Sequence, residues 1–162
     1  PMTGSEKTGY ANSDSSYLKD AYYILTPTEE VPAEYTSWLK NFIITAGSYC
    51  EIMDYKTHDN VTAAISHCPH IISASLINTV AELDDDGKYG RLAAGGLKDI
   101  TRISSSSPEM WQNICLSNPD AIVSFLNRYI ATLTNAKEAV ISGDSDKLMQ
   151  FFESAKKYRD KL

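Results

Sequence analysis

Strand-like runs occur only in the first third of this chain, and this restriction limits the possible folds more than any other feature. The runs cover residues 21–26 and 48–53. Between them lie apolar residues at helical spacing, namely Tyr35, Trp38, Leu39, Phe42 and Ile43, with Pro32 suited to the first turn and Gly47 to the end. A parallel sheet of two strands is too small to be stable by itself. We therefore predict that residues 1–53 are the end of a larger sheet domain.

From residue 54 onward the patterns are helical. A long helix is predicted over residues 57–80, with a kink at Pro69, which lacks an amide hydrogen and would collide with the carbonyl of Ile65. A second helix is predicted over residues 92–103, where Gly95 and Gly96 would each cost about 1 kcal/mol relative to alanine. We expect another backbone or a ligand to approach closely at these glycines.

Three further helices are expected towards the C-terminus. Ser107 and Pro108 are a good cap and first position for a short helix that runs to residue 116. One face of a long helix is marked by apolar residues, namely Ile122, Phe125, Leu126, Tyr129, Leu133, Ala136 and Val140. Asp144 can cap the last helix, whose inward face is expected to carry Leu148, Phe151, Phe152 and Ala155. Residues 54–162 are thus predicted to form an all-helical domain, and the fold class to be mainly α with a small α/β remnant in front.

Composition argues against several classes of protein. The net charge of −6 comes from 21 acidic and 15 basic residues without a basic run, so neither nucleic acid nor an anionic membrane surface is an expected partner. No stretch approaches 18 apolar residues, and the polar first 16 residues do not resemble a secretory signal. Three irregularly spaced cysteines indicate a reducing compartment, so we expect a cytoplasmic protein. The start at Pro1, without a preceding methionine, is typical of a piece of a longer protein.

All three histidines lie within thirteen residues, in His58-Asp59 and in the run from Ser66 to His70. His67 and His70 share a helix face and could bind a metal, but His58 falls on the opposite side and no cysteine or carboxylate has ligand spacing, so we expect no metal. An anion site in which His67 or His70 acts with Ser66 is a second interpretation. Two core histidines that donate to backbone carbonyls are an equally acceptable third.

Arg102 follows the double glycine and is a natural bidentate partner for a carboxylate. An ion pair between Asp99 and Arg102 on the helix surface is the commoner explanation of such a pattern. Likewise, Gly95 and Gly96 more often indicate tight helix packing than a phosphate loop, and they lack the spacing of a dinucleotide-binding loop. The residues by themselves leave these alternatives open.

Several motifs together resemble the prephenate dehydrogenase family. They are the stretch 1–9, Leu25-Thr26-Pro27, His58-Asp59, Ser66-His67-Cys68-Pro69-His70, the stretch 95–102 and Trp111. In order and spacing they cover nearly the whole chain. The resemblance implies an N-terminal Rossmann domain, ending at residue 53, and a helical dimerisation domain over residues 54–162, similar to the C-terminal fold of 6-phosphogluconate dehydrogenase. It also implies NAD- or NADP-dependent oxidative decarboxylation of prephenate to 4-hydroxyphenylpyruvate in tyrosine biosynthesis.

The resemblance further implies roles for individual residues. Arg102 would bind a substrate carboxylate, His70 with Ser66 or His67 would make polar contacts, and Trp111 would shape the pocket. Gly95 would lie where two subunits of a homodimer meet, and Glu6 matches an acidic position beside the family's catalytic histidine. That histidine and the nucleotide loop would precede Pro1, so this chain is expected to hold no cofactor and to be inactive alone. Arogenate as substrate, inhibition by tyrosine, and a stand-alone helical dimerisation module remain alternatives.

Overall fold

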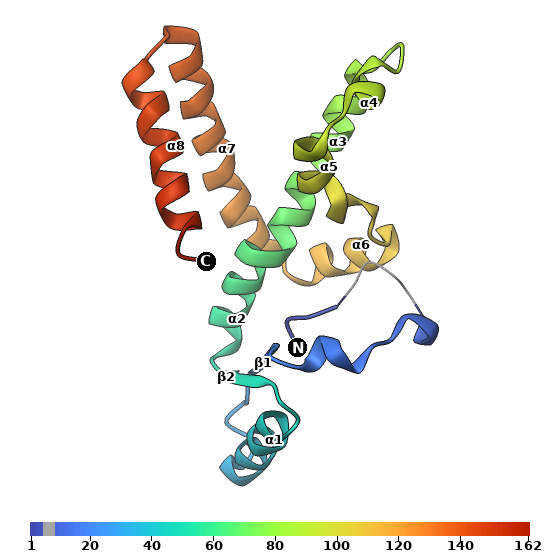
Figure 1. The fold of residues 1–162 in the computed structure, drawn as a ribbon. Coiled ribbons are helices and arrows are strands. Elements are labelled where there is room, and N and C mark those ends of the chain that lie inside the picture. The colour runs from blue at the N-terminus through green and yellow to red at the C-terminus, as the bar shows by residue number, and fades with distance from the viewer. Residues whose placement is uncertain (5–8) are drawn as a thin grey trace. The chain divides into compact units, whose positions relative to one another are not determined.

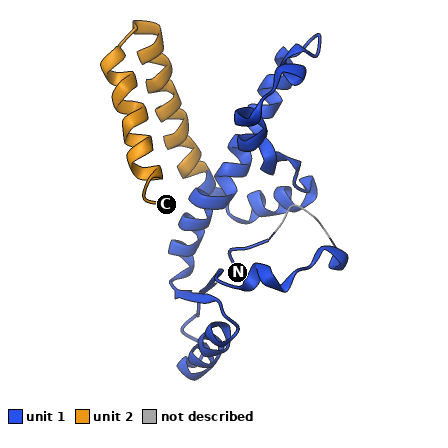
Figure 2. Ribbon diagram, viewed as in Figure 1, with its two compact units in different colours: residues 1–122 blue, residues 123–162 orange. Residues whose placement is uncertain are grey.

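The computed structural model describes residues 1–4 and 9–162. The chain divides into two compact units, residues 1–122 and residues 123–162, which are shown in different colours in Figure 2. Each unit is described by itself below. Glu6 lies outside the described residues, so its expected role in the site stays a prediction.

The first unit begins with two 3-10 turns and a small α/β segment. Strand β1 (Tyr22–Leu25) pairs in parallel with β2 (Tyr49–Ile52), and α1 (Ala33–Thr45) connects them. Pro32 immediately precedes α1, and Gly47 ends the connection with a φ of 87°. The predicted strand, helix and strand are therefore confirmed. Of the apolar positions predicted for the helix face, Ile43 is buried, whereas Trp38 is 67% exposed.

Helices α2 (Tyr55–Thr62) and α3 (Cys68–Leu83) are joined by a π-helical turn over Ala63–His67 (Figure 1). The turn ends two residues before Pro69, where the sequence predicted a kink. Because a π-helical turn holds more residues than an α-helical turn, the amide of Cys68 donates to the carbonyl of Ala63, five residues back. The next residue, Pro69, has no amide hydrogen to place, so the widened turn accommodates the proline without ending the helical path.

After α3, Asp84 and Gly87 form a turn into a short helix, α4 (Lys88–Leu92), which the sequence did not predict. Helix α5 (Gly95–Thr101) then begins at the first glycine, and the 3-10 turn Arg102–Ser105 follows it. The predicted helix over residues 92–103 was therefore wrong at its start. Because Gly95 and Gly96 occupy the first turn, they avoid the cost of interior glycines. Within the described chain, a Cβ on Gly95 would meet only Asp99 Oδ2 at 3.7 Å, and one on Gly96 would meet nothing within 4 Å.

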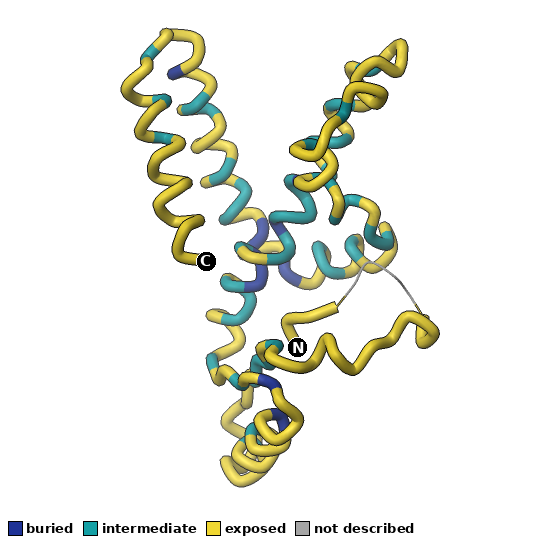
Figure 3. The backbone as a smooth tube through the Cα atoms, viewed as in Figure 1, coloured by how far each residue is buried: buried dark blue, intermediate teal, exposed yellow. Residues whose placement is uncertain are grey.

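Helix α6 (Pro108–Ser117) begins as predicted. The Ser107 hydroxyl accepts a hydrogen bond from the amide of Met110, and Pro108 occupies the first turn. Helix α7 (Pro119–Ser142) follows after Asn118, and its first four residues belong to the first unit. The core of this unit lies where the π-helical turn meets the start of α7, as the dark segments in Figure 3 show. There Ala63, Cys68 and Ile122 are 1%, 0% and 4% exposed.

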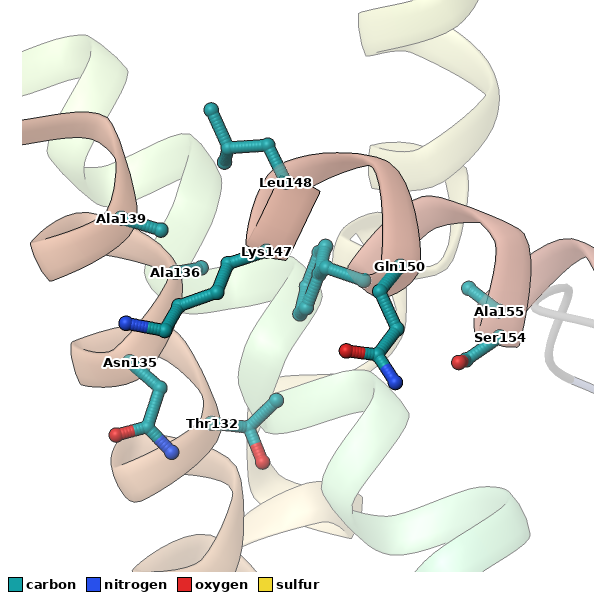
Figure 4. A pocket seen from close by; sticks show the side chains of 10 residues that line it. Thr132, Asn135, Ala136, Ala139, Lys147, Leu148, Gln150, Ser154 and Ala155 are labelled. Carbon is teal, nitrogen blue, oxygen red and sulfur yellow. The ribbon is translucent and has the colours of Figure 1, made fainter. Parts of the chain in front are cut away.

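The second unit is a hairpin of two helices, the remainder of α7 and α8 (Ser145–Arg159). Gly143 makes the turn with a φ of 66°, and the Asp144 carboxylate caps α8 by accepting from the amide of Lys147 at 3.0 Å, as predicted. A groove between the helices is lined by alanines of α7 and by Leu148 and Phe151 of α8 (Figure 4). Phe152 was predicted to face inward as well. Within this unit the prediction was wrong, because Phe152 is 66% exposed.

No helix among the described residues is both long enough and apolar enough to span a membrane.

Candidate functional site

The histidine cluster is set by the junction between the π-helical turn and α3. His67 ends the turn, and His70 lies in the first turn of α3. The ring of His70 stacks on the indole of Trp111 from α6, with ring centroids 3.6 Å apart and planes inclined by 22°. His67 meets the same indole edge-on, at 6.4 Å and 72°. Two of the predicted site residues, 41 and 44 positions before Trp111 in the sequence, are thus brought against it.

His70 is oriented by the π-helical turn that precedes its helix. Its Nδ1 atom lies 3.0 Å from the backbone carbonyl oxygen of Ser66, one turn earlier. A carbonyl can only accept, so Nδ1 must carry the proton, and Nε2 of the neutral ring is left as an acceptor. Ser66 was predicted to make polar contacts with a ligand. In the structure, the atom of Ser66 that bonds to the histidine cluster is its backbone oxygen, which accepts from His70, rather than its hydroxyl.

A cavity of about 350 Å³ adjoins the stacked pair. Three elements line it: α3, the 3-10 turn with the residues after it, and α6. The lining residues are His70, Ile71, Ala74, Asn78, Ile103, Ser104, Ser106, Pro108, Trp111 and Cys115. Apolar walls with a few polar groups are typical of sites for small molecules.

Trp111 contributes more than shape to this cavity. Its indole Nε1 is buried, and within the described structure it has no hydrogen-bond partner. An unpaired buried N–H group costs about 1–3 kcal/mol, so an acceptor that reached it after a shift of the indole would recover this energy. The indole lines the cavity as an apolar wall, and its buried N–H is an unused donor among the described residues.

His67 is favoured in its neutral form. Burial lowers its pKa most, followed by the charge of His58; Asp59 opposes the shift, and His70 adds to it. His58 itself lies 2.9 Å from the Asp59 carboxylate. Among the described residues, no three His, Cys, Asp or Glu side chains are placed to hold a metal ion.

The 3-10 turn that carries Arg102 is fixed to α3 by a buried serine. Ser73 donates to the carbonyl of Ile100 at 2.9 Å, and its oxygen lies 2.6 Å from the Ser104 hydroxyl. Ile103 and Ser104 line the cavity, but Arg102 is exposed and is not among the lining residues within one copy of the chain. Gly95 is also outside the lining. Of the predicted site residues, His70 and Trp111 line the cavity, and His67 contacts the same indole without lining it. Arg102 and Gly95 do not line this cavity either.

Sequence reasoning missed several polar residues of this region. Ser104 and Ser106 line the cavity, and Ser73 and Asn118 are buried with hydrogen bonds to distant elements. Ser73 stands three positions after His70 on one helix face, so helical spacing could have pointed to it. Nothing in the sequence spacing marked Asn118, because its partner Asp59 lies 59 residues away.

Comparison with known proteins agrees with the resemblance in sequence. The sequence profile described as "Prephenate dehydrogenase, dimerization domain" matches residues 54–154. The chain is 38% identical over its whole length to the prephenate dehydrogenase of Bacillus subtilis (strain 168), of which it covers 44%. The chain therefore spans less than half of the length of this relative.

Two solved structures are also similar. The Aquifex aeolicus prephenate dehydrogenase in complex with hydroxyphenyl propionate and NAD+ superposes with a TM-score of 0.91 at 28% identity, over 99% of this chain and 57% of that one. The Synechocystis arogenate dehydrogenase gives a TM-score of 0.87 at 26% identity, over 99% of this chain and 59% of that one. Since the family profile covers well over half of the chain, including the whole cavity beside His70 and Trp111, this protein belongs to the prephenate dehydrogenase family through its dimerization domain.

Proposed function

We propose that this chain is the dimerising, substrate-binding part of an NAD-dependent prephenate dehydrogenase. Residues 54–162 would form the helical domain, and residues 1–53 the end of the nucleotide-binding domain. The observation that carries the proposal is the family match over residues 54–154, which contain every residue that lines the cavity. The oxidised substrate would be prephenate, which gives 4-hydroxyphenylpyruvate and carbon dioxide.

The chemistry of the site supports a small anionic substrate. Prephenate carries two carboxylates and a ring hydroxyl, so it needs fixed hydrogen-bond donors and at least one cation. His70 and Trp111 line the cavity, and His67 contacts the same indole. Arg102 would supply the cation, because a guanidinium binds a carboxylate in a bidentate manner. Since Arg102 does not line the cavity of a single copy, we infer that it reaches the substrate only in the complete dimer, with Gly95 close to the subunit junction.

NAD would act as hydride acceptor and would bind elsewhere in the whole protein. The 162 residues contain no glycine-rich loop with dinucleotide-binding spacing, so the residues of this chain are assigned to binding and orienting the substrate. The chain by itself is accordingly proposed to be inactive. We propose a cytoplasmic homodimer, as expected for a biosynthetic enzyme whose matching domain is described as a dimerization domain. The same proposal includes NADP as an alternative cofactor and tyrosine as an inhibitor.

Arogenate is the alternative substrate, and the similarity to the Synechocystis arogenate dehydrogenase favours keeping it. Arogenate differs by an amino group in place of a keto group, which adds a positive charge at one end of the molecule. A dehydrogenase specific for arogenate would need an acceptor for that ammonium group. The two substrates can therefore be separated by measuring both with one enzyme.

The test replaces the matching region of the Bacillus subtilis relative with this chain and measures reduced cofactor formed with prephenate or arogenate. We expect the chimera to be active with prephenate and the isolated chain to be inactive. A folded, dimeric chimera that binds NAD+ but oxidises neither substrate would contradict the proposal. A stand-alone dimerisation module, the other alternative, would give that result.

The role of Arg102 is tested in the same chimera. Replacing Arg102 with alanine removes a charged hydrogen-bond partner of about 1.5–3 kcal/mol, so KM for prephenate should rise at least about tenfold. Arg91→Ala is the matched control, because Arg91 is an exposed arginine of α4 that bonds to the carbonyl of Asp86. Equal KM values for both variants would remove Arg102 from the site.

A further inference from the structure

Asn118 connects three helical elements around the His67 ring. It lies between the end of α6 and Pro119, the first residue of α7, and is only 8% exposed. Its side-chain nitrogen Nδ2 lies 2.8 Å from the backbone oxygen of Asp59 in α2. The same nitrogen lies 3.4 Å from Nδ1 of His67. One amide group therefore contacts both a carbonyl and an imidazole.

The chemistry of these partners determines which atoms carry hydrogens. The carbonyl of Asp59 can only accept, so the amide atom that faces it must be the nitrogen rather than the oxygen. An amide nitrogen carries two hydrogens and offers no lone pair. With one hydrogen on the Asp59 oxygen, the other faces His67, and Nδ1 of that ring has to accept it. The proton of a neutral His67 must then be on Nε2.

We propose that Asn118 is a positioning residue that holds His67 as the neutral tautomer with its proton on Nε2, which makes that N–H the donor of the ring beside Trp111. This inference concerns a residue that the sequence did not single out. The tautomer itself is independent of the proposed function. The identity of the acceptor, a carboxylate or hydroxyl oxygen of the substrate, rests on it.

The surroundings of His67 favour the neutral ring that this arrangement needs. Burial, His58 and His70 lower the pKa of His67, and Asp59 is the opposing charge. A protonated His67 would place an N–H group against the N–H of Asn118, which would break the contact. His70 has the opposite arrangement, because its Nδ1 donates to Ser66.

The tautomer can be measured by nitrogen-15 NMR of the histidine rings in the 162-residue chain. The sequence has three histidines, so His58→Gln and His70→Gln are sufficient to assign the His67 signals. We expect wild-type His67 to carry its proton on Nε2. In Asn118→Asp, the new carboxylate can only accept, so the proton should move to Nδ1 and the pKa of His67 should rise by about 1 unit or more.

Ser117→Asp is the matched control, since it adds the same charge at the neighbouring, exposed position. It should leave the tautomer on Nε2. If Asn118→Asp fails to fold, titration of the wild-type chain decides: the side-chain amide signals of Asn118 must shift with the same midpoint as His67. A wild-type His67 protonated on Nδ1, amide signals that ignore the titration, or an equal response in Ser117→Asp would overturn the proposal.

Enzyme activity distinguishes a failure of this inference from a failure of the proposed function. In the active chimera, Asn118→Ala should raise KM for prephenate about tenfold, because the loosened ring no longer holds its donor in place. If the NMR result is as expected but KM is unchanged, Asn118 positions His67 and His67 has no role in binding substrate. If the NMR measurement places the proton of wild-type His67 on Nδ1, the inference fails, whatever the substrate proves to be.

Discussion

The two helical regions, residues 54–122 and residues 123–162, differ in where their side chains find partners. In the first region, buried polar groups bond to distant elements: Ser73 to Ile100, and Asn118 to Asp59. In the second region, Ala139 is the one buried residue among those described, so no polar side chain is buried there. Large apolar side chains are exposed in both regions, for example Leu92 in the first. In the second region they include Ile130 (58%), Leu133 (49%), Val140 (65%), Ile141 (76%), Met149 (60%) and Phe152 (66%).

Buried polar groups and exposed apolar side chains have different consequences: the first specify contacts within the chain, and the second indicate contacts with another molecule. A buried polar group costs free energy unless it is paired, so these hydrogen bonds fix α3 against α5 and the turn after it, and α2 against the junction of α6 and α7. An exposed apolar surface of this extent indicates instead a contact with another molecule. Since the matching family profile describes a dimerization domain, a second copy of the chain is the expected partner.

The largest effect is therefore expected on dimerisation. Phe152→Glu would place an uncompensated charge in the expected interface, which costs about 3–5 kcal/mol, so the dimer dissociation constant should rise on the order of 1,000-fold. Sedimentation over a range of concentrations measures this constant, and circular dichroism checks that the helices remain.

Lys157→Glu is the control for Phe152→Glu. It changes the charge more, but at an exposed polar position about 140° around the same helix. A dimer that is unchanged by Phe152→Glu, or a wild-type chain that is monomeric at micromolar concentration, would show that the exposed face of the hairpin is not the dimer contact.

The next largest effect is expected in the core of the first region. Ile122 is 4% exposed, and its carbonyl accepts from the buried thiol of Cys68. Ile122→Ala should lower the free energy of unfolding by about 2–4 kcal/mol, as a cavity is left in the core. Val140→Ala, at a 65% exposed site, should change it by less than about 0.5 kcal/mol in the monomeric background of Phe152→Glu. Urea unfolding of both variants makes the comparison, and similar losses would mean that the hairpin is packed as tightly as the first region.

Local signals in the sequence predicted most helix and strand boundaries. Helix α6 starts as expected after Ser107 and Pro108, and α8 starts as expected after Asp144. These starts were predictable because capping depends on residues only three positions apart. The interruption predicted near Pro69 takes the form of a π-helical turn over Ala63–His67, just before the proline, because the missing amide of proline is a local constraint as well. The start of α5 was missed because the apolar pattern before Gly95 does not distinguish a helix interior from the preceding short helix and its connection.

The candidate site was predictable only in part, since it depends on long-range pairs. His67 and His70 stood out because three histidines are close in the sequence, but their contact with Trp111 joins residues more than 40 positions apart. The pattern could not show that Asn118 contacts His67. Phe152 was expected inside because helical periodicity identifies an apolar face without showing whether the chain itself or another copy covers it.

A smaller, pH-dependent effect distinguishes the first region from the second. The pKa of His67 is lowered in the folded chain, mainly by burial, so the unfolded chain binds its proton more tightly. Stability should therefore fall as the pH drops below the unfolded value of about 6.5 and level off below the folded pKa. Unfolding in urea at several pH values should show this loss in the wild type and a flatter profile in His67→Gln. An equally steep profile in His67→Gln would assign the dependence to other groups.

The smallest effects are expected at the two aspartates that cap helices in the two regions. Asp54 caps α2 and accepts from the amide and hydroxyl of Thr57; Asp144 caps α8 and accepts from the amide of Lys147. These hydrogen bonds lower the pKa of both carboxyl groups, led by the Thr57 hydroxyl for Asp54 and by the Lys147 amide for Asp144. Because the folded pKa is depressed, the stabilisation is present above the ordinary value of 3.8 and is lost as the pH falls through the folded value.

Asparagine separates the hydrogen bond of each cap from its charge. It accepts at the N-cap about as well as aspartate but does not titrate near pH 3.8. Asp54→Asn and Asp144→Asn should therefore keep most of the stability at neutral pH and lose the acid-dependent part, whereas the alanine variants lose both. At Asp54 the loss should extend to the environment of His67, which α2 leads into, while at Asp144 it should be confined to the fraying of α8. Urea unfolding measures the stability of each variant, and the NMR signal of His67 reports on the histidine site. A change in that signal caused by Asp144→Ala would show that the hairpin is coupled to the histidine site, so that the two regions are not independent.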